Sequence, residues 1–211
     1  MFWSGTLRTI NYSTYVSKEK EMTIYFTSDL HAHHKNIMKF CGRPYETVEE
    51  MTQSLTDTIN RIVKPTDVLY HLGDLSFSHK TQPIIDFINS INCKTIHLIL
   101  GNHDEIIRSK MDYFRQECPN IVEIVEERKR LKIEKIDVTL DHYPARSWYK
   151  SPYGAWQLHG HTHGSMERLG RSVDVGWDSP HITGSPLHRP ISFDELREFM
   201  KDIEPAKEFK E

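Results

Sequence analysis

The chain has 211 residues, of which 37% are hydrophobic and 27% are charged, and its formal net charge is −3. This length and composition predict a globular protein with a substantial core and exclude a disordered chain. The weak negative charge argues against a protein that coats duplex nucleic acid. No apolar run approaches the roughly 20 residues of a membrane span, so no membrane partner is expected.

Residues 1–21 lack the apolar core of about 7–15 residues that a secretory signal contains. We expect them to form an irregular extension, followed by a single domain over residues 22–211. The cysteines, Cys41, Cys93 and Cys118, are widely spaced and form no CxxC pair. Neither a disulfide framework nor a thiolate zinc site is expected, and a reducing cytoplasm suits the chain, whether of its own cell or of a host.

The first half of the chain alternates predicted strands with predicted helices. Residues 23–28, 68–72 and 95–100 are rich in β-branched and apolar residues and predict strands. Apolar residues recur every three or four positions over residues 48–62 and 81–92, which predicts helices. Connections between parallel strands are right-handed, so the carboxyl ends of these strands should share one edge, where ligands bind in such folds.

The second half of the chain is predicted to consist mainly of short strands. A short helix is expected over residues 106–114, a final helix after a capping pattern at Ser192, and a loop over residues 178–190. The predicted strands are 121–125, 130–134, 136–140, 155–158 and 172–175. The pattern as a whole predicts an α/β architecture of two packed sheets flanked by helices.

Seven side chains with oxygen or imidazole donors occur in short clusters at the ends of predicted strands. They are Asp29, His31, Asp74, Asn102, His142, His161 and His163. This set is too large for one metal ion and suits two ions that share a ligand, an arrangement that clamps the attacking and leaving oxygens of a displacement at phosphorus. Oxygen and imidazole ligands suit manganese, iron, zinc, nickel or cobalt better than copper(I).

The spacing of these residues predicts a role for several of them. Asp29 and His31 are two positions apart, so they would point the same way on a continuing strand. Asp74 offers two carboxylate oxygens and is the natural bridge between two ions. His103 is the candidate general acid for the leaving alkoxide, and Asp104 could orient its imidazole and keep it protonated.

The motifs DLH, GD, GNHD, a later histidine and GHTH occur here in this order, and they resemble those of the calcineurin-like metallophosphoesterase family from about residue 23 to residue 177. The resemblance implies a four-layer α-β-β-α sandwich of two mixed sheets. It also implies two metal sites and a catalytic histidine: Asp29, His31 and His163 for the first ion, Asn102, His142 and His161 for the second, Asp74 as the bridge, and His103 for catalysis.

Small bacterial and bacteriophage phosphoesterases are a closer likeness, through the patterns DLHxxHxNI, CxRP, HYP and HGHTH. The chain departs from them at Ala32 and His33, where an aromatic residue and glycine are common, and in its N-terminal extension. For the two divalent ions we take manganese as the first choice, with iron, zinc, nickel and cobalt as alternatives.

The residues that contact the substrate are less determined. We expect His34, Arg43 and Arg146 to reach it, because arginine can bind a phosphate through two hydrogen bonds. The alternatives are a helix start for His34 and ordinary surface salt bridges for the two arginines. The sequence does not predict an oligomeric state.

The expected activity is hydrolysis of a phosphodiester in a small nucleotide, linear or cyclic, by in-line attack of a hydroxide held by the metals. The alternatives are a phosphomonoesterase acting on a nucleotide or phosphoprotein, a nuclease, and a scaffold that has lost activity. The weak negative charge makes nucleic acid the less favoured partner, and the complete ligand set argues against an inactive scaffold.

Overall fold

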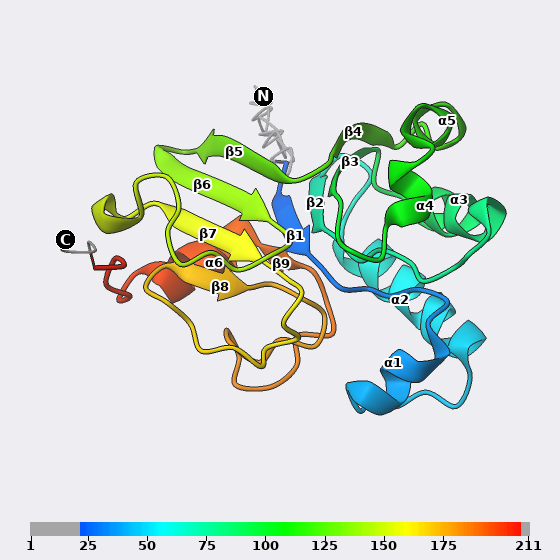
Figure 1. The fold of residues 1–211 in the computed structure, drawn as a ribbon, viewed down its shortest axis with the longest axis horizontal. Coiled ribbons are helices and arrows are strands. Elements are labelled where there is room, and N and C mark those ends of the chain that lie inside the picture. The colour runs from blue at the N-terminus through cyan, green and yellow to red at the C-terminus, as the bar shows by residue number, and fades with distance from the viewer. Residues whose placement is uncertain (1–21, 208–211) are drawn as a thin grey trace, which may run out of the picture.

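The structure is a computed structural model that describes residues 22–207 (Figure 1). The predicted extension, residues 1–21, lies outside the described residues. The fold consists of two mixed β-sheets flanked by helices, as the sequence predicted. No helix between residues 22 and 207 is long and apolar enough to cross a membrane.

The first sheet has five strands in the order β4-β3-β2-β1-β9. The first four pair in parallel, and β9 pairs antiparallel with β1. The strands are β1 (Ile24–Thr27), β2 (Val68–Leu72), β3 (Thr95–Ile99), β4 (Ile121–Val125) and β9 (Ile191–Ser192). The helices between them are α1 (Lys35–Phe40), α2 (Val48–Ile62), α3 (Thr81–Ser90), α4 (Glu105–Arg108) and α5 (Met111–Glu117).

The second sheet has four strands in the order β5-β6-β7-β8. Strands β5 and β6 form an antiparallel hairpin, with a turn at Glu134 and Lys135 that both have positive φ. Strands β6, β7 and β8 pair in parallel. The elements of this half are β5 (Arg128–Ile133), β6 (Ile136–Asp141), the 3₁₀ turn η1 (Ser151–Tyr153), β7 (Trp156–His159), β8 (Ser172–Asp174) and α6 (Phe193–Met200).

Two clusters of buried apolar side chains hold these layers together. The first joins α1–α5 to the first sheet; α2 contributes one face, with Met51, Leu55 and Ile59 fully buried. The second lies between the two sheets and includes Phe26 and Trp156, and α6 packs its apolar side chains into it. Figure 1 shows α2–α5 on the far side of the first sheet from the second sheet. Both faces of the first sheet are therefore covered. This leaves the carboxyl ends of its strands as the position for a ligand-binding site.

Two elements differ from the sequence expectation. The predicted helix over residues 106–114 is broken into α4 and α5 at Ser109 and Lys110, which lets both Ile107 and Phe114 point into the core. Strand β9 was not predicted, because two residues after Pro190 carry no periodicity and gain their strand geometry only by pairing with Tyr25 and Phe26.

Candidate metal centre

The predicted clusters lie at the carboxyl ends of strands from both sheets: β1, β2 and β3 from the first, β6 and β7 from the second. The chain segments after the strands stay hydrogen bonded, since the N–H of Asp29 donates to the carbonyl of Gly73 and that of His31 to the carbonyl of Asp74, each at 3.0 Å. The N–H of His161 donates to the Asp29 carboxylate at 2.9 Å, which joins the ends of β7 and β1 (Figure 1). Residues far apart in the sequence thus converge at one edge.

Six of the seven predicted ligands form two separate groups. Within each group the donor atoms lie within 4.8 Å of one another. The first group is Asp29, His31 and His163, and the second is Asp74, His142 and His161. The seventh, Asn102, adjoins the second group, because its Oδ1 lies 3.0 Å from His142 Nε2.

Asp74 faces both groups with its two oxygens. Its Oδ2 lies 3.5 Å from Nε2 of His31 and its Oδ1 lies 3.5 Å from Nε2 of His142. Burial alone would raise the pKa of Asp74, but the neighbouring His142 and His31 hold it well below its usual range. In return, although burial disfavours the charged ring, Asp74 and Asp29 raise the pKa of His142 to about 9. A carboxylate in this position is suited to bridging two cations.

The chemistry of His31 fits a metal ligand. Its ring is buried, and neither ring nitrogen has a hydrogen-bond partner among the described residues. Burial is the main reason that its pKa is lowered to about 2, so the imidazole is neutral and its lone pair is available. A buried polar group without a partner is costly, and a bound cation would remove that cost.

The backbone of the ligand segments is held in an unusual conformation. Asp29, His31, Asp74, His161 and His163 all have φ between +46° and +67°, in the left-handed region. Non-glycine residues seldom adopt it, and backbone strain of this kind costs on the order of 1–3 kcal/mol per residue and tends to cluster at functional sites. The rest of the fold must therefore hold these five donors in place.

Two glycines allow the ligand segments to approach one another. A Cβ on Gly101 would overlap the carboxylate of Asp74, and a Cβ on Gly160 would overlap Ser28 and the carboxylate of Asp29. Any larger residue at these positions would push a ligand segment out of place. The glycines in the GNHD and GHTH motifs are thus explained by packing beside the carboxylates.

A buried ion-pair network orients His163. Its Nδ1 lies 2.8 Å from Asp178 Oδ2, which leaves Nε2 for the centre. Arg43 donates to both oxygens of Asp178, at 2.9 and 2.8 Å, and to the carbonyls of Asp29 and Leu30, each at 2.7 Å. Burial opposes ionisation of Asp178, but hydrogen bonds from His163 and Arg43, among others, hold its pKa well below its usual range.

The expectation that Arg43 contacts the substrate is therefore wrong. Its side chain is buried, and its guanidinium is occupied by Asp178 and two backbone carbonyls. It supports the predicted ligand Asp29 through the carbonyl of that residue and the predicted ligand His163 through Asp178.

The expected role of Asp104 is also corrected. Its carboxylate accepts hydrogen bonds from the N–H groups of Asp74, Leu75 and Gly101, at 2.8 to 3.0 Å, and it is buried. It holds the segments after β2 and β3 together and does not orient the imidazole of His103, since both of its oxygens are directed at the backbone.

His103 lies outside both ligand groups. Its side chain is 39% exposed and its Nε2 lies 3.9 Å from Asp74 Oδ2. The ring is therefore beside the bridge but open to a bound molecule, as proton transfer to a substrate requires.

A cavity of about 520 Å³ opens onto the centre. One side is formed by ligands and His103. The other is formed by His34, Ile37, Phe40, Cys41 and Phe77. His34, expected near the substrate, thus lines this cavity, with its ring centroid 4.0 Å from that of Phe77.

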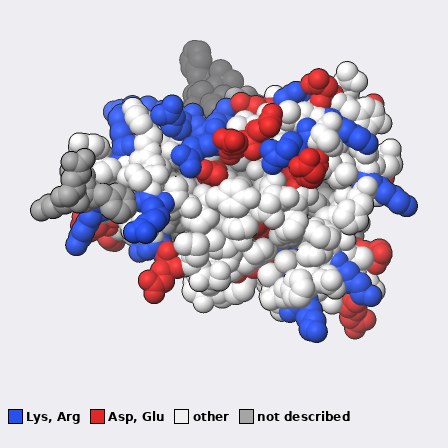
Figure 2. Space-filling view, in the orientation of Figure 1, with Lys and Arg blue, Asp and Glu red and all other residues white. Residues whose placement is uncertain are grey.

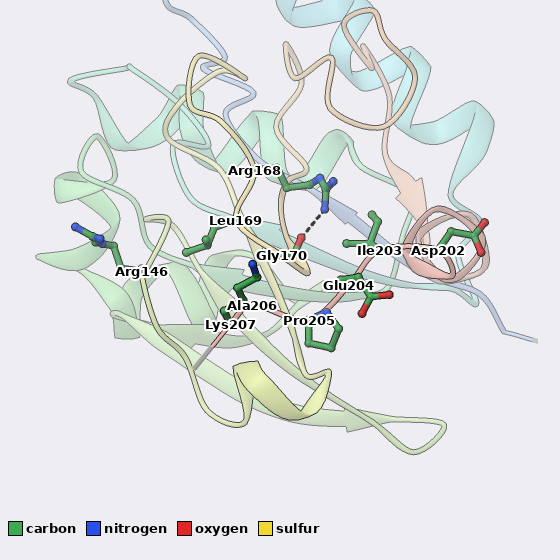
Figure 3. Close-up of a pocket in the computed structure, with 10 residues that line it drawn as sticks. All are labelled: Arg146, Arg168, Leu169, Gly170, Asp202, Ile203, Glu204, Pro205, Ala206 and Lys207. Carbon is green, nitrogen blue, oxygen red and sulfur yellow. Dashed lines mark hydrogen bonds between the residues drawn. The ribbon is translucent and has the colours of Figure 1, made fainter. Parts of the chain in front are cut away.

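Arg146, also expected to contact the substrate, lines a different cavity. Figure 3 shows it with the segment Arg168–Gly170 and the C-terminal segment 202–207. None of the seven predicted ligands lines that cavity. Arg146 is not among the residues that line the cavity at the centre, so its contact with the substrate stays a prediction.

Sequence reasoning missed several residues around the centre. Asp178 was placed in a loop without a role, and Phe40, Phe77 and the half-exposed Tyr143 were not assigned to the cavity or its surroundings. Tyr143 could have been found, because it follows His142 in the HYP motif, and its ring lies 4.6 Å from that of His161. Asp178 gives no local signal, because its partner Arg43 is 135 positions away.

Comparison with known proteins adds a family assignment for this architecture. The family model described as calcineurin-like phosphoesterase matches residues 22–165. An uncharacterized protein of Methanocaldococcus jannaschii is 31% identical over 141 residues, which cover 66% of this chain and 69% of that protein. The Gene 66 protein of Mycobacterium phage L5 is 29% identical over 204 residues, which cover 85% of this chain and 94% of that protein.

A solved structure shares the fold. It is a protein of unknown function from Aquifex aeolicus, with a TM-score of 0.61 and 21% sequence identity. The match covers 84% of this chain and 99% of that protein.

Proposed function

Because this chain belongs to the calcineurin-like phosphoesterase family and is a hydrolase of phosphoesters, we propose that it cleaves a phosphodiester in a small nucleotide with the help of two divalent cations. The observation that carries the proposal is the position of Asp74, which belongs to the second group and also faces His31 of the first, with His103 just outside both groups.

The ligands divide between two ions as the geometry groups them. Asp29, His31 and His163 would hold one ion, His142, His161 and Asn102 the other, and Asp74 would contact both. Such a pair activates water and neutralises charge on the phosphate. We take manganese as the first metal to test, because oxygen and imidazole ligands suit it.

The residues of the chain supply the remaining steps. His103 is placed to give a proton to the leaving oxygen, so that an alcohol departs and not an alkoxide. Asp178 and Leu72 accept hydrogen bonds from Nδ1 of His163 and His142, which orients both rings.

The charges around the cavity favour a diester over a monoester. None of the residues that line it is lysine or arginine. A diester carries one negative charge on its phosphate, which two cations can neutralise. A monoester or a polyphosphate carries more charge, for which no cationic side chain of the described cavity lining is available.

The distribution of cations also favours a small substrate over a nucleic acid. Figure 2 shows that lysine and arginine gather over the β5–β6 hairpin on the face in view. Two cations of strand β5 are paired, Arg128 with Asp141 and Lys129 with Glu123, and Lys150, which follows the hairpin in the chain, is paired with Asp137. A nuclease would need such cations to bind the phosphate backbone of a nucleic acid. Its affinity for that nucleic acid would fall steeply as the salt concentration rises.

The test compares turnover of bis(p-nitrophenyl) phosphate and p-nitrophenyl phosphate with manganese, followed by a screen of cyclic and linear nucleotides with manganese, nickel, iron and zinc. We expect faster cleavage of the diester and no activity in the presence of a chelator. Faster cleavage of the monoester would overturn the choice of a diester. Activity unaffected by Asp74→Asn would overturn the proposed role of the centre.

A further inference from the structure

We propose that His34, Phe40 and Phe77 form an aromatic face that receives the leaving alcohol of the substrate, and that this face selects an alcohol carrying an uncharged aromatic ring, such as a nucleoside. The inference rests on the proposed diesterase function and adds to it the side of the phosphate on which the aromatic group lies.

The aromatic face is built from two segments that meet over the centre. Phe40 is the last residue of α1, and the residue is 72% exposed. Phe77 comes from the segment after Asp74, and its ring centroid lies 4.0 Å from that of His34, which in turn lies 6.4 Å from that of Phe40. All three line the cavity that opens onto the metal ligands. A large aromatic side chain as exposed as Phe40 next to a polar centre is suited to contact with a ligand.

The position of His103 determines which part of the substrate meets this face. In the proposed reaction, the bond from phosphorus to the leaving oxygen breaks as an oxygen from water attacks from the opposite side. The proton that the leaving oxygen acquires comes from His103, so the leaving group must lie next to that ring. Phe77 is its neighbour, with a centroid distance of 5.0 Å, and His34 lies at 6.5 Å. The leaving group is therefore placed against the aromatic face.

The surroundings of the second ligand group differ from the aromatic face. Tyr143 lies beside the second ligand group, with its ring centroid 4.6 Å from that of His161 and its hydroxyl 3.4 Å from Asn102 Oδ1. Tyr143 is not among the residues that line the cavity bordered by the aromatic face. The two substituents of the phosphate thus meet different surroundings, an aromatic face on the leaving side and a phenol on the retained side.

The charge of the cavity restricts the leaving group further. Its described lining contains histidines and apolar side chains but no lysine or arginine. A leaving group with further phosphates would bring negative charge onto Phe40 and Phe77 with no cation to pair with. The face therefore fits a nucleoside better than a nucleotide.

The test measures KM and kcat for Phe40→Ala and Phe77→Leu on two diesters that share one leaving group, bis(p-nitrophenyl) phosphate and methyl p-nitrophenyl phosphate. Stacking on an aromatic side chain is worth enough to expect a rise in KM of about five- to thirtyfold. The rise should be the same for both diesters, with little change in kcat. The control is Tyr113→Ala, which removes a half-exposed aromatic ring from α5 and should leave both constants unchanged.

A second substrate pair tests the nucleoside itself: a dithymidine phosphodiester and the same compound with an abasic sugar at the leaving position. Loss of that base should raise KM for the wild type about as much as Phe40→Ala does for the intact compound. Phe40→Ala should then have no further effect on the abasic compound.

The outcomes separate the two proposals. If the wild type cleaves neither diester, the proposed function fails. If it cleaves both but Phe40→Ala raises KM only for the bis(p-nitrophenyl) compound, the face holds the retained group and our assignment is reversed. If Phe40→Ala and Phe77→Leu behave like Tyr113→Ala, the aromatic face takes no part in binding.

Discussion

His103 is the residue whose removal should distinguish chemistry from metal binding. It lies outside both groups of candidate ligands, and its ring nitrogen Nε2 comes no closer than 3.9 Å to the carboxylate of Asp74. We expect His103→Ala to lower kcat about a hundred- to ten-thousandfold for a diester with an alkyl leaving group. The loss should be much smaller for p-nitrophenyl esters, because p-nitrophenolate leaves without a proton.

Rates for the two kinds of ester, with metal content measured in parallel, check this prediction. The variant should retain the metal content of the wild type. An equal loss for both esters would show that His103 has a role other than proton donation.

Arg43 is charged and buried, so its replacement should change the stability of the protein. Arg43→Met should lower the free energy of unfolding by about 3–5 kcal/mol, since it leaves the charge of Asp178 buried without its arginine partner. Urea unfolding measures the loss. Arg115→Met is the matched control: it removes an exposed arginine paired with Asp112, and its effect should stay below about 1 kcal/mol.

At this scale the sequence predicted that the candidate ligands lie close together, but not which residues support them. Asp29, His31 and Asp74 could be assigned because each follows a strand in a short motif, and strand ends converge. The functions of Arg43 and Asp104 could not, because they depend on partners that only the folded chain brings near: a carboxylate 135 positions away and three backbone N–H groups.

At the scale of elements, helix α6 begins with a capping box between Ser192 and Glu195. Burial would raise the pKa of Glu195, but hydrogen bonds from Arg189 and Ser192 lower it below its ordinary value of 4.5. A folded-state pKa below the unfolded one adds stability above the ordinary pKa, and that stability disappears as the pH falls through the folded value.

Glu195→Gln should therefore be less stable than the wild type at pH 7, and the difference should shrink as the pH is lowered towards 3. Urea unfolding across this range measures it. Glu198→Gln, on the exposed part of the same helix, is the control and should change stability little at either pH. A difference for Glu195→Gln that stays constant with pH would contradict the prediction.

The strands and long helices could be predicted because their patterns are local. Helix α2 has its cap at Thr47 and one apolar face, and it was predicted with its observed bounds. The break between α4 and α5 could not be predicted, because it follows from the two directions in which Ile107 and Phe114 meet the core.

At the scale of the whole molecule, the proposed ligands come from both sheets, so binding of metal ions should stabilise the packing of one sheet on the other. An ion that binds only the native state adds about 2.7 kcal/mol at a concentration 100-fold above its Kd. We expect manganese to raise Tm in wild type and to have little effect on Asp74→Asn.

The rise in Tm should be larger at pH 8 than at pH 6. Although burial alone would lower both values, carboxylates raise the pKa of His142 to about 9 and that of His163 to about 10. Both rings are then protonated at pH 6 and must release protons for metal to bind, so a higher pH favours binding. Thermal unfolding with and without manganese at the two pH values checks this, and a larger rise at pH 6 would count against the assigned ligands.

The division of the ligands between the sheets also bears on synthesis of the chain. Residues Asp29 to His103 leave the ribosome well before His142, His161 and His163, and Asp178 comes later still. A nascent chain that has completed only strands β1 to β4 of the first sheet holds Asp74 and His103 but only part of each proposed cation site. Hydrolytic activity should therefore begin only once translation has passed the second sheet.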